Sequence, residues 1–400
     1  MKIIHTSDWH LGHQLYNYDR LDEHRYFIRQ LAGIISRHSP DALIIAGDIF
    51  DQQSPSLAAQ QLWVEALGEL LEADPKVEII AIAGNHDSGS RLAVHAPLLR
   101  KRLHIIGRDP EIITLGEPQT PTGVVAAIPY LPDFAFRRYL DEAEIDSEED
   151  PVEAFYAMMA KKTRQAAGNC DIPRIAVSHI AVSGADTSSH PLRDFNFFAA
   201  DRIAADFHYH ALGHIHFPQS FLNNRVRYSG SPFPLSFDEP YHHSVSLVEV
   251  EPGEAGLSVE TVGIEPLRRV VTLPKDKSAV EISGIQNLID SVPREDEIYL
   301  RVKVETIGNV PESVNAALRN AFRDTNVRYC LAQAVPPPLH EDEKEERSPE
   351  RSVSIDEMRE INPLELADLH FRRKYARPIP PELRSLLDEI LAGDQELSDK

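Results

Sequence analysis

The stretch Ala42-Leu43-Ile44-Ile45-Ala46-Gly47-Asp48-Ile49-Phe50-Asp51 joins an apolar run to a cluster of polar residues. A short apolar run bounded by turn residues is typical of a strand buried inside a sheet. Open α/β sheets place their functional sites at the carboxyl ends of such strands. We therefore expect a site to begin at Gly47-Asp48, where this strand stops.

The sequence around this strand alternates strand and helix patterns, as α/β layered folds do. Amphipathic helix patterns over 21–36 and 57–71 separate the first three strand patterns. Later strand patterns, among them 208–216 and 244–250, predict that a second sheet completes the domain. We expect a two-sheet sandwich with helices outside it, over residues 1–266.

A second α/β pattern begins at residue 267. It runs strand, helix, strand, helix, strand, and predicts a separate small α/β domain over 267–335. Three prolines and an almost wholly charged segment then predict a linker over 336–353. The remaining residues, 354–400, predict a helical tail with one apolar stripe, made of Leu383, Leu386, Leu387, Ile390 and Leu391. Such a stripe is expected to be buried, either on this chain or on a partner.

The composition excludes several classes of protein. The 400 residues carry 41 Lys plus Arg against 63 Asp plus Glu, a formal net charge of −22, which argues against a generally basic nucleic-acid coat protein. DNA binding is not excluded, because a few basic residues or metal ions can serve one face. The 2 cysteines are too few for a disulfide framework. No apolar stretch reaches the roughly 18 residues that cross a bilayer, so we expect a cytoplasmic chain.

Five polar blocks at strand ends combine carboxylate, amide and imidazole side chains. This mixture suits two borderline divalent cations better than calcium, for which oxygen ligands alone are expected. On a strand or its frayed end, the spacing of Asp8 and His10, and of His214 and His216, puts each pair on one face. A single such residue more often caps a turn, and only the ordered set favours a metal site. The candidate ligands are Asp8, His10, Asp48, Asn85, His179, His214 and His216.

The ordered blocks Asp-x-His, Gly-Asp-x-x-Asp, Gly-Asn-His-Asp, a lone His and Gly-His-x-His resemble the calcineurin-like metallophosphoesterases, which fold as a four-layer αββα sandwich. The opening residues His5 to Gly12, the small second domain and the tail are similar to nuclease subunits of bacterial DNA-repair complexes within that family. The resemblance implies two metal ions, Mn²⁺ by analogy, bridged by Asp48. One ion would be held by Asp8, His10, Asp48 and His216, and the other by Asp48, Asn85, His179 and His214.

His86 lies beside a candidate ligand but outside the ligand set. Water acidified by two cations can attack a phosphodiester, so no Ser or Cys nucleophile is needed. The leaving oxygen still needs a proton, and a histidine titrates in the range suited to supplying it. We assign His86 as the catalytic acid or transition-state stabiliser, with a carboxylate of Asp51 or Asp87 as the candidate that orients it.

The resemblance implies a metal-dependent DNA nuclease that works with a partner ATPase, acting on duplex ends as an ATP-dependent 3′-to-5′ exonuclease and on single strands or hairpins as an endonuclease. It also implies a dimer within that complex, a small domain that selects DNA, and a tail that docks on the ATPase. Two alternatives stay open: a phosphoesterase for nucleotides, cyclic nucleotides or phosphoproteins, and a non-catalytic scaffold of the same fold. Trp9 is expected to pack beneath the site, and the roles of His13 and His190 stay open as DNA contacts or surface residues.

Overall fold

The computed structural model describes residues 1–94, 102–145, 150–188, 197–252, 256–275 and 278–337, together with Arg384. Residues Met1–Pro337 form one compact unit. The second unit, Pro338–Lys400, lies outside the described residues apart from Arg384. The predicted tail helices and most of the predicted linker therefore fall outside this description. No helix in the described ranges is long and apolar enough to cross a membrane.

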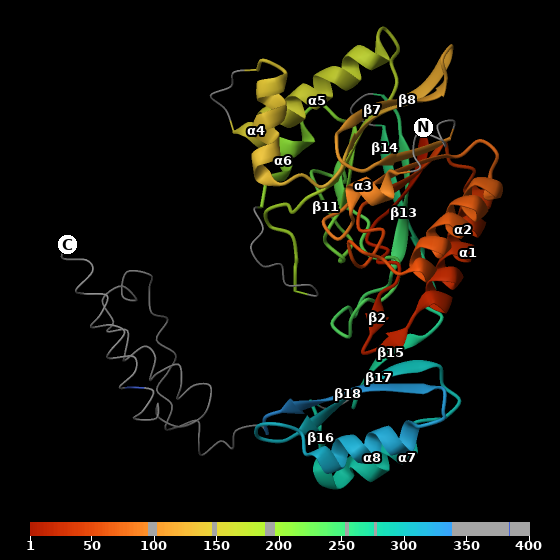
Figure 1. Ribbon diagram of the computed structural model, residues 1–400, viewed down its shortest axis with the longest axis vertical. Helices are drawn as coiled ribbons and strands as arrows, with labels where there is room; N and C mark the ends of the chain where they lie inside the picture. Colours follow the sequence, from red (N-terminus) through yellow and green to blue (C-terminus); the bar gives the residue numbers. More distant parts are fainter. Residues whose placement is uncertain are drawn as a thin grey trace. The chain divides into compact units, whose positions relative to one another are not determined.

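The first large sheet has six strands in the order β14-β13-β1-β4-β5-β6 (Figure 1). Its strands are β1 (Lys2–Thr6), β4 (Ala42–Ala46), β5 (Glu78–Ile82), β6 (Leu103–Ile106), β13 (Ser244–Val250) and β14 (Leu257–Gly263). The run β1-β4-β5-β6 is parallel, and β13 pairs antiparallel to β1. Every residue of β4 is buried, as its continuous apolar run predicts.

The second large sheet also has six strands, in the order β11-β12-β10-β9-β8-β7. They are β7 (Glu111–Glu117), β8 (Thr120–Ile128), β9 (Arg174–His179), β10 (Tyr209–Gly213), β11 (Gln219–Phe221) and β12 (Val226–Tyr228). The two sheets share one apolar core, in which side chains such as Ile44 and Ile80 of the first meet Val125 and Val177 of the second. The predicted second sheet is confirmed.

Helices cover the outer faces of both sheets (Figure 1). On the first sheet, α1 (Leu21–His38) and α2 (Leu57–Ala73) bury their apolar stripes in one cluster. On the second, the covering helices are α4 (Asp133–Glu142), α5 (Pro151–Ala167) and α6 (Ala200–Ala204). A short helix, α3 (Gly89–Leu92), follows β5. The layers are helix, sheet, sheet and helix, which confirms the predicted four-layer αββα sandwich.

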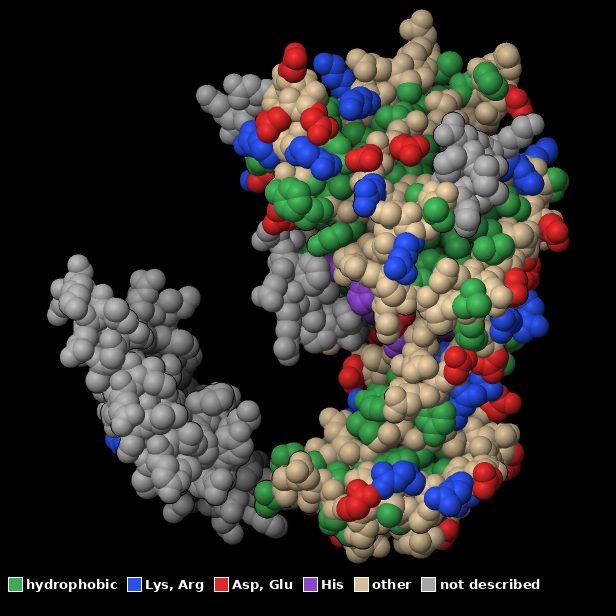
Figure 2. Space-filling view, viewed as in Figure 1, with side chains coloured by type: hydrophobic (Ala, Val, Ile, Leu, Met, Phe, Trp, Pro, Cys, Tyr) green, Lys and Arg blue, Asp and Glu red, His purple; other side chains and the backbone are tan. Residues whose placement is uncertain are grey.

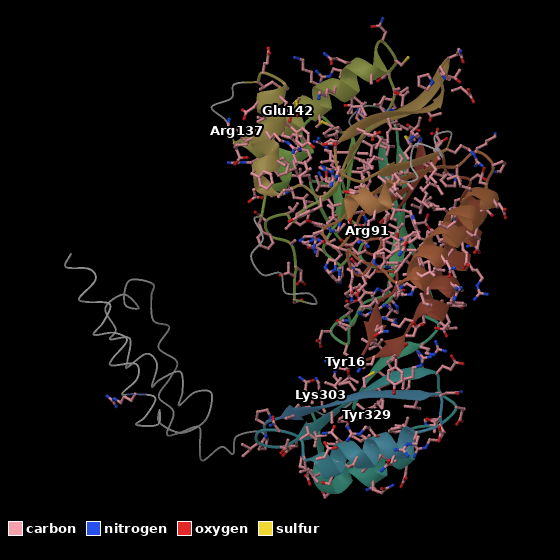
Figure 3. The ribbon with its side chains drawn as sticks, viewed as in Figure 1. Tyr16, Arg91, Arg137, Glu142, Lys303 and Tyr329 are labelled. Carbon is pink, nitrogen blue, oxygen red and sulfur yellow. The ribbon has the colours of Figure 1, made fainter. Side chains whose placement is uncertain are left out.

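A smaller parallel sheet occupies the last part of the described chain. Its central strand β17 (Ile298–Glu305) pairs with β15 (Arg269–Leu273), β16 (Val280–Glu281) and β18 (Val327–Val335). The helices α7 (Ile285–Ser291) and α8 (Glu312–Phe322) cover it and supply a separate apolar core, and the short 3-10 helix η2 (Ile282–Gly284) precedes α7. The hairpin of β2 (Gln14–Leu15) and β3 (Tyr18–Asp19) touches this sheet, because the Tyr18 hydroxyl donates to the Tyr329 carbonyl at 3.1 Å (Figure 3 labels Tyr329). The predicted strands and helices are observed in order, the short strand β16 is an addition that was not predicted, and a domain boundary at 266 stays a prediction.

Candidate metal centre

The polar blocks from both large sheets meet at one edge of the sandwich. Two groups of three side chains each could hold a metal ion. Within each group the candidate ligand atoms lie within 4.8 Å of one another, and all six residues are buried. The first ligand group is Asp8, His10 and His216, and the second ligand group is Asp48, His179 and His214. Figure 2 shows histidine side chains in a recess of this face. Residues far apart in the sequence are thus gathered into one site.

The backbone turns sharply after each strand to deliver these side chains. Positive φ angles occur at Asp8 (55°), His10 (44°), Asp48 (48°) and His214 (101°), the left-handed region that costs of order 1–3 kcal/mol for a side-chain-bearing residue. Backbone hydrogen bonds of 3.0 Å hold the turns, from the Asp8 N–H to the Gly47 carbonyl and from the His10 N–H to the Asp48 carbonyl. Of the two expected positions, an extended strand or its frayed end, the structure excludes the extended strand for Asp8 and His10. The strand ends at Thr6, and left-handed turns bring both side chains to the site.

Three glycines permit the close approach of the strand ends. A Cβ atom added to Gly47 would overlap His179 Nδ1, and one added to Gly84 would overlap Asp48 Oδ1. At Gly213 the added atom would overlap the main-chain carbonyl of Ala46. Any larger residue at these positions would have to displace a candidate ligand or a strand.

The second ligand group converges on one point. His179 Nδ1 donates to the Ala46 carbonyl at 2.9 Å, so Nε2 is the nitrogen turned to the centre, 3.3 Å from Asp48 Oδ2. Asn85 Oδ1 lies 3.0 Å from both His179 Nε2 and His214 Nδ1. Burial lowers the pKa of His179, but the charge of Asp48 outweighs it and raises that pKa to about 9. Asn85 therefore lies beside His179 and His214, the two histidines of the ligand set in which it is predicted.

Asp48 lies between the two groups. Its Oδ2 atom is 3.3 Å from His179 Nε2 and 3.7 Å from His10 Nε2, while its Oδ1 accepts the His86 N–H at 2.9 Å. Burial raises the pKa of Asp48, but the charges of His179 and His10 outweigh it and hold the pKa well below the usual range. One carboxylate oxygen thus faces a histidine of each group.

The first ligand group contains a ring nitrogen without a hydrogen bond. His10 Nε2 is fully buried and has no hydrogen-bond partner within the described ranges, although buried polar atoms are normally hydrogen-bonded. Its other nitrogen, Nδ1, lies 3.4 Å from Asp51 Oδ1. Asp8 is held by the Ser7 hydroxyl at 2.6 Å and by the His214 N–H at 3.0 Å. A buried imidazole nitrogen turned toward carboxylates is the donor arrangement that a divalent cation fits.

Glu239 is a residue that sequence reasoning missed. Its side chain is 1% exposed, with Oε1 3.6 Å from His216 Nδ1 and Oε2 accepting the Leu235 N–H at 3.0 Å. Burial lowers the pKa of His216, but Glu239 and Asp8 outweigh it and raise that pKa. A carboxylate behind a histidine ligand fixes the ring and its tautomer. The only signal in the sequence is the acidic pair Asp238-Glu239, which directly follows the mainly apolar segment 233–237.

His86 lies beside the first ligand group. Its ring meets the His10 ring edge-on, with centroids 4.9 Å apart, and its Nδ1 lies 2.8 Å from the Asp51 carbonyl. A carbonyl only accepts, so Nδ1 carries the hydrogen and Nε2 is left to exchange a proton. The expectation of an orienting carboxylate is wrong, because the main chain of Asp51 does this. The Asp87 carboxylate instead accepts N–H groups of Gly84, Ile49 and Phe50 at 2.9–3.0 Å.

The remaining predicted residues have simpler surroundings. Trp9 is fully buried, donates to Thr6 Oγ1 at 3.0 Å and packs edge-on against Phe27, as expected of a packing residue. His13 is half-buried rather than a plain surface residue, 3.5 Å from an Arg20 nitrogen, and burial lowers its pKa to about 3. His190 lies outside the described residues.

Comparison with known proteins also points to a metal-dependent phosphoesterase. Residues 1–218 match the calcineurin-like phosphoesterase family. The chain is 34% identical over 274 residues to the SbcD subunit of the SbcCD nuclease of Rhodobacter capsulatus, covering 64% of this chain and 68% of that protein. It is 34% identical over 309 residues to the SbcD protein of Bacillus subtilis (72% and 75% covered) and 31% identical over 320 residues to that of Escherichia coli K12 (76% and 78% covered). The chain therefore belongs to the calcineurin-like phosphoesterases, a family of metal-dependent hydrolases, and within them to the SbcD subunits of SbcCD nucleases.

Proposed function

We propose that this chain is the nuclease subunit of an SbcCD-type complex and hydrolyses DNA phosphodiesters with a pair of divalent metal ions. The observation that carries the proposal is Asp48, whose one carboxylate oxygen faces a histidine of each ligand group. A carboxylate between two clusters of nitrogen and oxygen donors is the geometry of a bridging ligand. The family relationship supports the same assignment.

The proposed ligand sets follow the two groups. Asp8, His10, Asp48 and His216 hold one ion, and Asp48, Asn85, His179 and His214 hold the other. The donors are oxygen and imidazole nitrogen without sulfur, which suits Mn²⁺ among the ions of this class. When bound, the pair would acidify a water and neutralise the phosphate oxygens.

The chain's own residues then perform the proton transfer and the positioning. His86 keeps Nδ1–H on the Asp51 carbonyl and presents Nε2 as the atom that gives a proton to the leaving oxygen. Proton donation of this kind contributes about 10²–10⁴-fold in rate. Glu239 holds the His216 ring, and Asp87 fixes the loop that carries Asn85 and His86.

The proposed substrate is DNA, and the proposed partner is an SbcC-type ATPase. The proposal includes ATP-dependent 3′-to-5′ cleavage of duplex ends, cleavage of single strands and hairpins, dimerisation of this protein within the complex, and roles in DNA repair, recombination and replication in the cytoplasm. The relatives named as subunits of SbcCD nucleases support it. The rival is a phosphoesterase that takes only nucleotides or phosphoproteins.

The test is cleavage of labelled hairpin and duplex oligonucleotides by the purified chain with Mn²⁺, with and without the partner ATPase and ATP. We expect cleavage that requires the metal and falls about 10²–10⁴-fold in His86→Ala, with the metal content unchanged. The exposed His242 offers a matched control, and His242→Ala should cleave normally. Hydrolysis of nucleotides without any cleavage of DNA would support the rival.

A further inference from the structure

A cavity of about 460 Å³ opens beside the second ligand group. His179 and His214 belong to its lining, so it is continuous with the proposed metal centre. Its volume falls within the range of roughly 300–1,000 Å³ typical of ligand pockets. The reaction as proposed uses no part of this cavity beyond the two histidines.

Aromatic and apolar side chains form the other walls. Tyr130, Phe134 and Phe198 line the cavity together with Ile180. Phe134 is 73% exposed, a large apolar ring in solvent at the mouth of the cavity. The Tyr130 ring meets the His179 ring edge-on with centroids 6.4 Å apart, so one wall touches a candidate ligand directly.

The walls are held in place by the main chain. The Tyr130 N–H donates to the Ala83 carbonyl at 2.8 Å, and the Phe198 N–H donates to the Ala181 carbonyl at 3.0 Å. The Phe198 ring also packs edge-on against Phe136, with centroids 6.1 Å apart. The packed Phe198 ring and the fixed main chain at Tyr130 lower the cost of ordering the protein around a planar group.

The charge of the lining indicates what kind of group would enter. No Lys or Arg belongs to the lining as far as the chain is described, and Asp133 brings an acid to it. Figure 3 shows Arg137 on α4, the helix that carries Phe134, at the outer edge of the molecule. The described lining thus offers aromatic and apolar side chains, on which an uncharged aromatic ring can stack.

We propose that this cavity binds the nucleobase next to the cleaved phosphodiester, with Tyr130 and Phe134 as its stacking surfaces. The inference rests on the proposed nuclease function and specifies how that site holds its substrate. The phosphate would lie at the ligand groups, and the attached base would enter between the rings. Every base has an aromatic face, so the cavity would position DNA without selecting a sequence.

The experiment uses the full-length chain in complex with its ATPase, with Mn²⁺ and a set of single-stranded oligonucleotides. Each strand contains one abasic residue, at a different position, and the cleavage rate at every bond is read from a sequencing gel. The bond next to the abasic residue, on the same side of that residue in every strand, should be cut about 5- to 150-fold more slowly than the same bond in the intact strand. Other bonds of the same strand are the internal control.

Variants connect this loss to the protein. Tyr130→Ala, and to a smaller degree Phe134→Ala, should slow cleavage of the intact strand by a similar factor but add little to the effect of the abasic residue. Tyr130→Phe keeps the ring and should behave as wild type. Ile307→Ala, at an 85% exposed residue outside the cavity, is the control. Fluorescence anisotropy with Ca²⁺ in place of Mn²⁺ should show the same pattern in the affinity for the oligonucleotides.

Each other outcome has a defined meaning. Cleavage that does not respond to abasic residues, or that responds equally in Tyr130→Ala, overturns the base subsite and leaves the nuclease intact. Absence of cleavage of the intact strand overturns the nuclease function and the subsite with it. Loss of complex formation in Tyr130→Ala would assign the cavity to the partner ATPase and overturn the proposal.

Discussion

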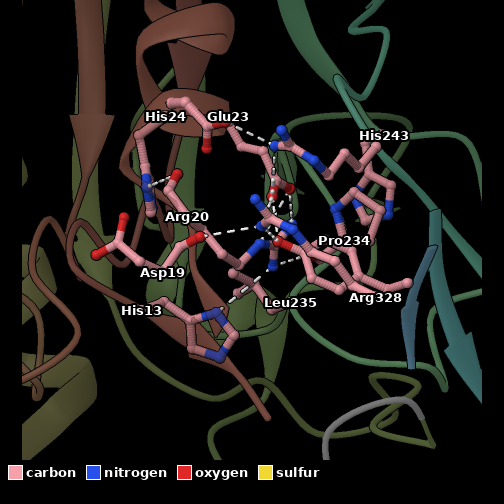
Figure 4. A network of polar contacts seen from close by, with 12 residues as sticks. His13, Asp19, Arg20, Glu23, His24, Pro234, Leu235, His243 and Arg328 are labelled. Carbon is pink, nitrogen blue, oxygen red and sulfur yellow. Dashed lines mark hydrogen bonds and ion pairs between the residues drawn. The ribbon is translucent and has the colours of Figure 1, made fainter. Parts of the chain in front are cut away.

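Two buried polar clusters lie close together in this fold, and they differ in how fully their atoms are hydrogen-bonded. The Arg20 cluster consists of Arg20, Glu23, Tyr299 and Arg328, and it joins α1 to the small sheet through the Tyr299 hydroxyl. Figure 4 labels Arg20, Glu23 and Arg328 of this cluster. Arg20 is fully buried and donates to Glu23 at 2.6 and 3.0 Å and to the Pro234 carbonyl at 2.6 Å. Glu23 in turn accepts from the Tyr299 hydroxyl.

The metal centre is as deeply buried, but not all of its polar atoms find a hydrogen-bond partner among the described residues. His10 Nε2 makes no hydrogen bond in the described part of the chain, and Asp48 Oδ2 faces ring nitrogens of both ligand groups. Burial of charged side chains is therefore no sign of a functional site by itself. The Arg20 cluster completes its own hydrogen bonds and stabilises the fold, whereas the metal centre converges donors on points that a cation can occupy.

The largest effect is expected from Asp48→Asn. Removing the charge that both metal sites share should weaken the binding of both ions. We expect kcat to fall by more than about 10³-fold, because loss of a single charge-stabilising group usually costs up to about that factor. Metal content after dialysis, measured by mass spectrometry, and DNA cleavage check this. His10→Ala should instead affect mainly one ion. Undiminished metal in Asp48→Asn would remove Asp48 from the bridge.

The next effect concerns the Arg20 cluster. Glu23→Ala leaves the buried Arg20 guanidinium without its carboxylate and should lower the free energy of unfolding by about 3–5 kcal/mol. Urea unfolding followed by fluorescence measures it. Metal content of the folded protein should stay at two ions, the reverse of the result for Asp48→Asn. Loss of metal in Glu23→Ala would show that the two clusters act as one.

A smaller effect is expected from Glu239→Gln, which tests where the metal centre ends. Glutamine can still accept the Leu235 N–H but no longer places a charge behind His216, so the affinity for one ion should fall about 10–100-fold. Titration calorimetry with Mn²⁺ separates the two ions. Asp186→Asn, at an exposed carboxylate, is the control. Equal affinities in wild type and Glu239→Gln would assign Glu239 to the structure alone.

The smallest effect is expected in the pH dependence of the free energy of unfolding. It comes from a third buried cluster, around His210, whose ring nitrogens are both hydrogen-bonded. His210 accepts from Ser178 Oγ at 2.9 Å and donates to the Ile203 carbonyl at 3.1 Å, and burial lowers its pKa to about 3. The unfolded histidine, with a pKa of about 6.5, binds the proton more tightly. The contribution of neutral His210 to the free energy of unfolding is therefore complete above about pH 6.5. As the pH falls below that value, it is lost at about 1.4 kcal/mol per pH unit. Urea unfolding at pH 7 and pH 5 should show a shallower loss in His210→Gln, and an unchanged slope would contradict this.

The sequence was sufficient to predict the fold and most of the polar residues gathered at the site. Strand, helix and polar block recur in order, and parallel strands bring their carboxyl ends to one edge. Other features depend on tertiary contacts that no local pattern contains. Glu239 reaches His216 only because its loop folds back, and Arg20 and Glu23 resemble ordinary charges at the start of a helix until Tyr299 covers them. The left-handed turns at Asp8 and His10 were hidden because both residues fit an extended spacing equally well.

The positive φ angles at the strand ends have a consequence for the evolution of the chain. Glycine adopts this backbone region without strain, and asparagine tolerates it better than most residues. Replacing Asp8, His10 or His214 by glycine would therefore relax the main chain while it removed a candidate ligand. A duplicated copy released from selection for hydrolysis would lose the backbone strain at such a position together with the reaction. Aspartate and histidine persist at these turns only while selection for the chemistry outweighs the benefit of a relaxed backbone.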